Sequence, residues 1–401
     1  MINKKKIYPQ LIFFYSILFI FGFFISITVK YGDDVDTHSL ILSYLNIIEK
    51  GIYSPSRFYG SPLAEIIIGF FSYNLGGLFT SFICYLLFII SAISIFNFCY
   101  SKKNEQTYRN FYLLLAITNP ILLFDNSNPS DFILALFFFS IGILALKSKF
   151  NYLSSIFLAF SIACRANFAA FVYAILLYDF FFNKKKNAIS TIFIIINTTI
   201  IGGLFYLPIF IQNKFGFEFI KNGGGPSFEI YQLLPRFIYK IYQTLGIYNS
   251  FLIFALFFFI NKKIIKEILL KFKKELLIIF LNLFIFFFIP TKTAIITLAV
   301  LFFYIIIIKF LKKKLITVMI LLNLLYWIVG YKIFDINYKN QNQCEAIQAT
   351  KVEFSIKLEK GFYLTKKEKI KIKMNCDSIF FKNKKNYRDG KKLSTDNTFG
   401  H

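Results

Sequence analysis

Apolar runs separated by short polar or basic segments dominate the chain. Residues 11–29 and 251–260, for example, contain no charged side chain. A helix that crosses the hydrocarbon core of a bilayer needs roughly 18 or more such residues in succession. The pattern predicts an all-α polytopic membrane protein with about 11 membrane segments, some of them short or re-entrant.

A hairpin rather than a single span is expected over residues 150–182. Basic residues bound this segment at both ends, and the sequence CRAN, which contains Arg165, interrupts its middle. Each arm has about 15 residues, and at about 1.5 Å per residue it is shorter than the hydrocarbon core of about 30 Å. We predict two short helices that enter and leave on one side and turn beside a water-filled cavity.

Two long loops, 30–77 and 212–246, are predicted on the outer side of the membrane. DTHSLILSYLNIIEK in the first and FEIYQLLPRFIYKIYQTL in the second place apolar residues at three- and four-residue spacings. A helix with one apolar and one polar face is typical of a membrane surface. We therefore predict outer-surface amphipathic helices in both loops.

The formal net charge of +25 orients the chain and does not indicate a nucleic-acid partner. Most lysines and arginines before residue 331 fall in segments that alternate with segments richer in acids. This alternation follows the rule that short cytoplasmic loops are basic. We infer a multi-pass protein of the plasma membrane, with the lipid bilayer as a partner and a cytoplasmic N-terminus.

The chain divides into a transmembrane domain, 1–331, and a small basic tail, 332–401. The helix count places the tail on the extracytoplasmic side. Period-two alternation over 351–376 predicts a small β-rich domain there, followed by a disordered end. In an oxidising compartment Cys344 and Cys376 can form a disulfide, whereas on a cytoplasmic tail they would be free thiols.

Few polar residues are expected at the outer level of the membrane, and the acidic pair Asp33 and Asp34 are the candidate catalytic residues. A carboxylate can act as general base toward an acceptor hydroxyl, while Arg or Lys can stabilise a departing phosphate. Paired acids can instead hold a divalent metal, and no other cofactor is indicated. The candidate substrate- or phosphate-binding residues are Arg57, Glu65, Asp125, Asn126, Asp131, Arg165, Arg236 and Lys292.

Structural interpretations stay open for several of these residues. Asp36 can simply cap the surface helix that it precedes. Arg165 lies among apolar residues, where a charge is costly, so it either pairs with Asp125 or Asp131 or faces a lipid phosphate. The glycine-rich segment NGGGPS, 222–227, can cradle a phosphate through backbone amides or serve as a hinge.

Four segments carry a resemblance to a known family: GDDVD (32–36), YSPSRFYGSPLAE (53–65), NPILLFDNSNPSD (119–131) and FLAFSIACRANFAAF (157–171). Together with the first spanning helix and the long outer loop, they resemble the GT-C superfamily of integral-membrane glycosyltransferases. These enzymes use polyprenyl-phosphate sugars and include relatives of the protein O-mannosyltransferases and the lipid A aminoarabinose transferases. The resemblance covers roughly residues 1–330 in layout and these segments in sequence.

The resemblance implies that a sugar is transferred, with inversion, from a polyprenyl-phosphate donor to a lipid-linked or cell-surface glycan acceptor on the extracytoplasmic face. It also implies that Asp33 or Asp34 is the general base. The chain departs from the family at the PTKT turn, which carries Lys292 and no carboxylate, and in its small tail. The alternatives are a polysaccharide polymerase or ligase, a lipid-linked glycan transporter or flippase, and a non-enzymatic assembly subunit.

Overall fold

The computed structural model describes residues 4–32, 35–57, 60–100, 106–182, 188–212, 214, 230–259, 261–290, 292–338, 349–360, 362–364 and 367 of the 401-residue chain. Its helices and strands are α1 Lys4–Val29, α2 Val35–Lys50, α3 Pro62–Cys99, α4 Gln106–Thr118, α5 Pro120–Ser127, α6 Asp131–Lys147, α7 Asn151–Cys164, α8 Phe168–Phe182, α9 Ala188–Gln212, α11 Ile230–Leu245, α12 Ile247–Phe259, α13 Lys262–Lys271, α14 Lys273–Phe288, η1 Thr293–Ile296, α15 Thr297–Phe310, α16 Lys313–Ile328, β1 Val329–Tyr338 and β2 Ala349–Lys360.

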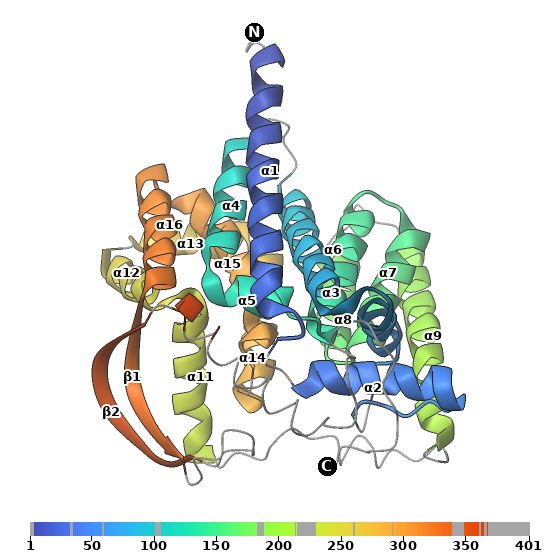
Figure 1. Cartoon of the computed structure of the whole chain (residues 1–401). Helices are drawn as coiled ribbons and strands as arrows, with labels where there is room; N and C mark the ends of the chain where they lie inside the picture. Colours follow the sequence, from blue (N-terminus) through green and yellow to red (C-terminus); the bar gives the residue numbers. More distant parts are fainter. Residues whose placement is uncertain are drawn as a thin grey trace.

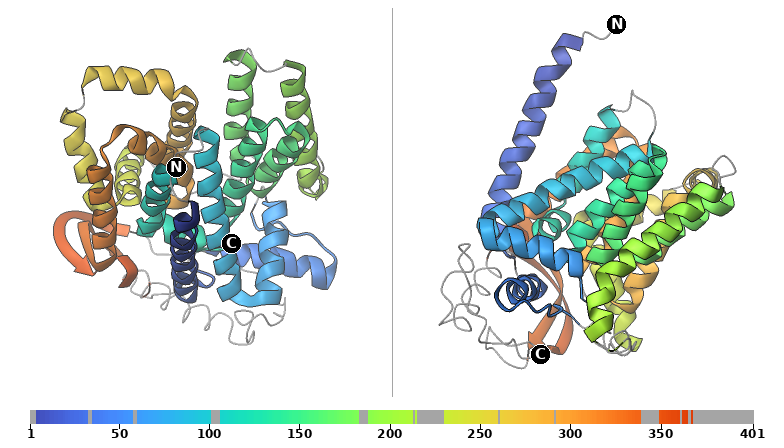
Figure 2. Two further views of the ribbon diagram at one scale, coloured as in Figure 1. Left: turned by 90° about the horizontal axis from the view of Figure 1, so that it is seen from above. Right: turned by 90° about the vertical axis from the view of Figure 1, so that its right-hand side faces the viewer.

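The helices form a bundle with one helix laid across its end. In Figure 1, α1, α4, α9 and α16 run roughly upright, whereas α2 lies crosswise below α1 and reaches the lower part of α9. At its N-terminal end α1 extends past the other helices (Figure 2). The second helix expected on the outer surface, α11, stands upright in Figure 1 and packs Phe237 against Phe286 of α14.

The expectation of about 11 membrane segments is wrong for the described residues. Three of their helical segments are long and apolar enough to cross a membrane: α3, α9, and η1 together with α15. The α5–α6 pair passes the same test as one unit but bends by 100° at its break. Polar or Pro-containing breaks at 119–120, 128–130 and 165–167 cut the apolar stretches into helices shorter than a full span.

The length and composition of these helices identify the chain as a membrane protein. The helix α9 carries polar or small residues such as Thr191, Thr198 and Gly202 on its buried side, as expected where membrane helices pack closely together. Its exposed side is mostly apolar and carries eight large side chains: Ile189, Ile192, Phe193, Ile196, Ile200, Leu204, Leu207 and Ile211. Such a face suits contact with lipid chains.

The expected C-terminal β-rich domain is also wrong for the described residues. Only two antiparallel strands form, with Val329 paired to Lys360 and Tyr338 to Ala349, and a two-stranded ribbon encloses no core of its own. The strand β1 follows α16 without a break. Beyond β2, the Tyr363 ring lies 6.2 Å from that of Trp327 in α16, so this part of the tail packs on the bundle.

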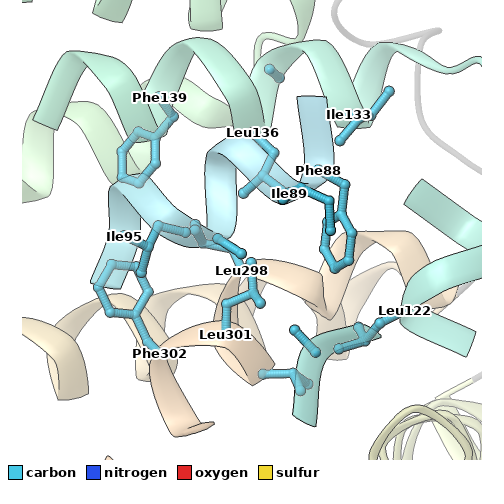
Figure 3. Close-up of a cluster of buried hydrophobic side chains, with 14 of the residues drawn as sticks. Phe88, Ile89, Ile95, Leu122, Ile133, Leu136, Phe139, Leu298, Leu301 and Phe302 are labelled. Atoms are coloured by element: carbon cyan, nitrogen blue, oxygen red, sulfur yellow. The ribbon is translucent and has the colours of Figure 1, made fainter. Parts of the chain in front are cut away.

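A continuous apolar core joins the central helices. Helix α3 lies between α6 and α15 in this core, and α5 closes one end (Figure 3). The packing fixes the starts of α3 and α6 relative to each other, and both starts carry acidic residues of the candidate site. The labelled core residues are Phe88, Ile89, Ile95, Leu122, Ile133, Leu136, Phe139, Leu298, Leu301 and Phe302.

Candidate functional site

Three helices begin with an acidic side chain at the end of the bundle where α2 lies. Asp36 is in the first turn of α2, Glu65 in the first turn of α3, and Asp131 is the first residue of α6. The free backbone N–H groups of a helix start stabilise a nearby carboxylate.

Asp131 is fully buried and forms the centre of the site. Its Oδ2 atom accepts hydrogen bonds from Arg165 at 2.5 Å and from the Ser61 hydroxyl at 3.1 Å. Arg165 occupies the break between α7 and α8, and its guanidinium lies 3.3 Å from the centroid of the Phe132 ring. The sequence predicted either Asp125 or Asp131 as the partner of Arg165, and the structure pairs it with Asp131.

Arg57 joins Asp131 to a second carboxylate. Its two terminal nitrogens lie 3.2 Å from Asp131 Oδ2 and 2.6 Å from Asp36 Oδ2. Lys292, the residue before η1, forms a further ion pair with Asp36. We call Asp36, Arg57, Asp131, Arg165 and Lys292 the ion cluster; its three basic side chains outnumber its two carboxylates.

Exposure rises steadily across the ion cluster. The side chains of Asp131 and Arg165 are 1% and 7% exposed, Arg57 is 15% exposed, and Asp36 and Lys292 are 28% and 32% exposed. A buried ion pair is costly to leave incomplete, whereas an exposed one contributes little to folding. The buried pair of Asp131 and Arg165 is therefore suited to stabilising the fold. The more exposed Asp36 and Lys292 are accessible to a ligand.

The loop before α3 surrounds the Glu65 side chain. Its carboxylate accepts hydrogen bonds from the Tyr53 hydroxyl at 2.6 Å, from the Ser56 backbone and hydroxyl at 2.8 and 2.5 Å, and from the Ser61 backbone at 3.1 Å. Glu65 is fully buried. We call this the Glu65 clamp. It fixes the loop that carries Arg57, and Ser61 links it to Asp131.

The Glu65 clamp also changes the acidity of Tyr53. Burial, and the neighbouring Glu65 carboxylate, raise the pKa of the Tyr53 phenol well above its ordinary value. Tyr53 therefore keeps its proton at neutral pH and remains a hydrogen-bond donor to Glu65.

Three other candidate residues lie apart from the ion cluster's direct contacts. Asp125 accepts a hydrogen bond from Thr293, the residue after Lys292. Asn126 is buried and donates to Thr297, which joins α5 to α15. Arg236 is on the exposed surface of α11. Asp125 thus supports the segment that carries Lys292, and Asn126 has a packing role.

The proposed capping role of Asp36 is not what the structure shows. The helix α2 begins at Val35, so Asp36 is already inside its first turn, and its carboxylate pairs with Arg57 and Lys292. An N-cap residue precedes the first helical residue and accepts from the N–H groups that follow. The sequence alone could not predict this, because an acid before or at a helix start can either cap the helix or form an ion pair.

Several predicted features lie outside the described residues. They are the candidate bases Asp33 and Asp34, the glycine-rich segment 222–227, and Cys344 and Cys376 with their predicted disulfide. In the sequence, Asp33 and Asp34 stand directly before α2, three and two residues ahead of Asp36. Within the described ranges, no group of three or more His, Cys, Asp or Glu side chains could hold a metal ion.

Sequence reasoning missed the residues that fix the acids and the arginine in place. Tyr53, Ser56 and Ser61 were not singled out, although all three belong to the YSPSRFYGSPLAE segment. Their common signal is a run of hydroxyl residues and prolines before a helix with an acid in its first turn. Phe132, which lies beneath Arg165, had no distinguishing signal in so apolar a sequence.

No family model matches the chain, and no curated protein or solved structure matches it either.

Proposed function

We propose that the chain is a GT-C-like membrane glycosyltransferase. It transfers a sugar from a polyprenyl-phosphate donor to a lipid-linked or cell-surface glycan on the extracytoplasmic side. The supporting observation is that Arg57 and Lys292 meet at Asp36, in the more exposed part of the ion cluster. The acidic pair Asp33 and Asp34 directly precedes this helix in the sequence. A base and a cationic phosphate site are the two requirements of the reaction.

In the proposed reaction, Asp33 or Asp34 takes the proton of an acceptor hydroxyl. The acceptor oxygen forms a bond to the anomeric carbon of the sugar while the bond from that carbon to the phosphate oxygen breaks. The lipid phosphate leaves with the bonding electron pair. A single displacement of this kind inverts the anomeric configuration.

The basic side chains act on the leaving phosphate in this proposal. Arg57 and Lys292 provide positive charge where negative charge develops on the departing oxygen, which lowers the barrier. Asp131 and Arg165 act indirectly, because Asp131 holds Arg57 and Arg165 balances the charge of Asp131. They are positioning residues in this account.

The location of the ion cluster favours a transferase over a transporter. The cluster includes Asp36 of α2, the helix that lies crosswise below the C-terminal end of α1 in Figure 1. Secondary transporters instead place their substrate sites near the middle of the bilayer. An enzyme that joins a lipid-linked donor to a water-exposed acceptor needs its polar groups at the membrane surface.

The base assignment is tested by replacing Asp33→Asn and Asp34→Asn one at a time in cells that depend on this chain for a surface glycan. We expect one variant to lose nearly all labelled glycolipid or glycan, measured by mass spectrometry, at unchanged protein level. Lys50→Gln changes an exposed charge at the end of α2 and serves as the control. Full product from both Asp variants would show that neither carboxylate is the base.

A further inference from the structure

The helix α13 is amphipathic, and Ile268 is its one side chain that packs against the main core cluster among the described residues. Ile264, Ile265 and Leu269 lie on one face, and Lys263 and Lys266 lie on the other. None of its 10 residues is buried. Its apolar side chains remain accessible, with Ile265 38% and Leu269 56% exposed. The helix therefore has an apolar face that the described parts of the chain leave largely uncovered.

Exposed lysines extend beyond α13 to neighbouring elements. Phe272, between α13 and α14, lies 5.7 Å from the ring of Phe310 at the end of α15. This contact brings the start of α16 to the same end of the bundle as the start of α14. We call the resulting set of exposed lysines the lysine surface: Lys262, Lys263, Lys266, Lys271, Lys273, Lys312, Lys313 and Lys314.

Within the part of the chain that the structure describes, little negative charge balances the lysine surface. Glu267 is the one acid in α13, and it pairs with Lys271 at 2.5 Å in an exposed contact between successive turns. Among the described residues, Lys262, Lys263 and Lys266 form no ion pair. A partner for this face must therefore be anionic and, beside the apolar face of α13, also apolar.

We propose that the lysine surface binds the headgroups of anionic phospholipids, with the apolar face of α13 inserted among the acyl chains of the same leaflet. Basic amphipathic helices lie in the membrane interface in this manner, and anionic leaflets attract clustered lysines over short distances. The neighbouring helices α12 and α14 favour a lipid over an acidic protein. Both are apolar, and both expose large aromatic side chains such as Phe254 and Phe280.

This assignment does not depend on the proposed enzymatic activity. It concerns the end of the bundle at which α14 and α16 begin, whereas the ion cluster lies with α2. It also gives the basic loops a function beyond orientation, since a leaflet rich in anionic lipid would hold this end of the protein in place.

The full chain, reconstituted into nanodiscs of phosphatidylcholine and phosphatidylglycerol in equal amounts, provides the test. After release into detergent, native mass spectrometry counts the lipids of each class that stay bound. We compare the wild type with the double variant Lys263→Gln/Lys266→Gln. The matched control, Lys50→Gln/Lys214→Gln, removes the same charge from two exposed lysines outside the lysine surface. Gel filtration of each variant verifies folding.

We expect the ratio of bound phosphatidylglycerol to phosphatidylcholine to fall at least about threefold in the α13 variant and to stay unchanged in the control. Equal ratios in all three proteins would overturn the proposal, and so would an equal fall in the control, which would indicate a response to net charge alone. Displacement of phosphatidylglycerol by millimolar inorganic phosphate would assign the surface to free phosphate rather than to lipid.

Discussion

Asp131 and Arg57 show how the surroundings of a charged side chain decide what it does. Asp131 has its charge balanced by Arg165 and Arg57 in a buried setting, so its contribution is to structure. Arg57 bridges the buried and exposed parts of the ion cluster, because it contacts both Asp131 and Asp36. Its position suits a residue that must be held firmly and still reach a ligand.

Replacing Asp131→Asn should strongly destabilise the protein. The change leaves Arg165 and Arg57 without their shared carboxylate, and breaking a buried ion pair costs about 3–5 kcal/mol. The double variant Asp131→Asn/Arg165→Gln should lose less unfolding free energy than the sum of the two single losses, because no charged Arg165 is then left buried without its carboxylate. Thermal unfolding in detergent measures all three.

The exposed pair between Glu267 and Lys271 is the control for this prediction. Glu267→Gln should change the free energy of unfolding by no more than about 0.5 kcal/mol, because exposed pairs of this spacing contribute little. If the unfolding free energies lost in Asp131→Asn and Arg165→Gln simply added in the double variant, Asp131 and Arg165 would not act as a pair.

Tyr53 should make stability depend on alkaline pH. Its folded pKa is raised by burial and by Glu65, so its stabilising effect is complete below the unfolded pKa of about 10 and is lost as the pH rises toward the folded value. Tyr53→Phe removes the hydrogen bond and should be less stable than the wild type at neutral pH. The difference should shrink above pH about 10, as measured by denaturant unfolding. A constant difference across the pH range would disprove the linkage.

At the scale of elements, the position of α2 determines whether the ion cluster can form. The helix carries Asp36 and packs on α3, where Tyr44 lies directly over Gly69. The apolar spacing in the sequence predicted a helix here and its amphipathic character. It could not predict which partner helix it would meet, because a glycine contact leaves no periodic signal.

Substituting Gly69→Ala should displace α2. An added Cβ would lie 2.1 Å from Tyr44 Cβ, so the helices must move apart, at a cost of about 1–3 kcal/mol. Gly203→Ala in α9 is the opposite case, since nothing lies within 4 Å of its added Cβ. There, helix propensity predicts a gain of up to about 1 kcal/mol. If unfolding experiments showed that both substitutions change the free energy of unfolding in the same direction, the described packing of α2 on α3 would be wrong.

For the whole molecule, the sequence predicted the membrane environment well and the number of spans poorly. Apolar content alone indicates lipid, but breaks such as Asn119–Pro120 and the turn at Arg165 depend on buried partners for their polar groups. A hydropathy pattern contains no information about those partners. The sequence pattern also predicted too much structure in the tail. Period-two alternation predicted a β-rich domain, whereas the described residues form only a two-stranded ribbon.

The candidate site was predictable in its residue types and not in their roles. The sequence singled out Arg57, Asp131, Arg165 and Lys292, and the structure brings all four into one network with Asp36. The sequence also grouped Glu65 with the ligand-facing residues, whereas its hydrogen bonds are all directed to its own loop. Distance along the chain cannot distinguish an acid that meets a ligand from one that holds a loop.

If Arg57 and Lys292 receive the leaving phosphate, removing either charge should slow sugar transfer in isolated membranes. Product formed from a labelled polyprenyl-phosphate sugar is compared for Arg57→Gln, Lys292→Gln and the control Lys50→Gln. We predict losses of roughly a hundredfold for Arg57→Gln and at least tenfold for Lys292→Gln, with the control unchanged and all three proteins folded. Transfer at the wild-type rate by folded Arg57→Gln and Lys292→Gln variants would show that neither side chain acts on the leaving phosphate.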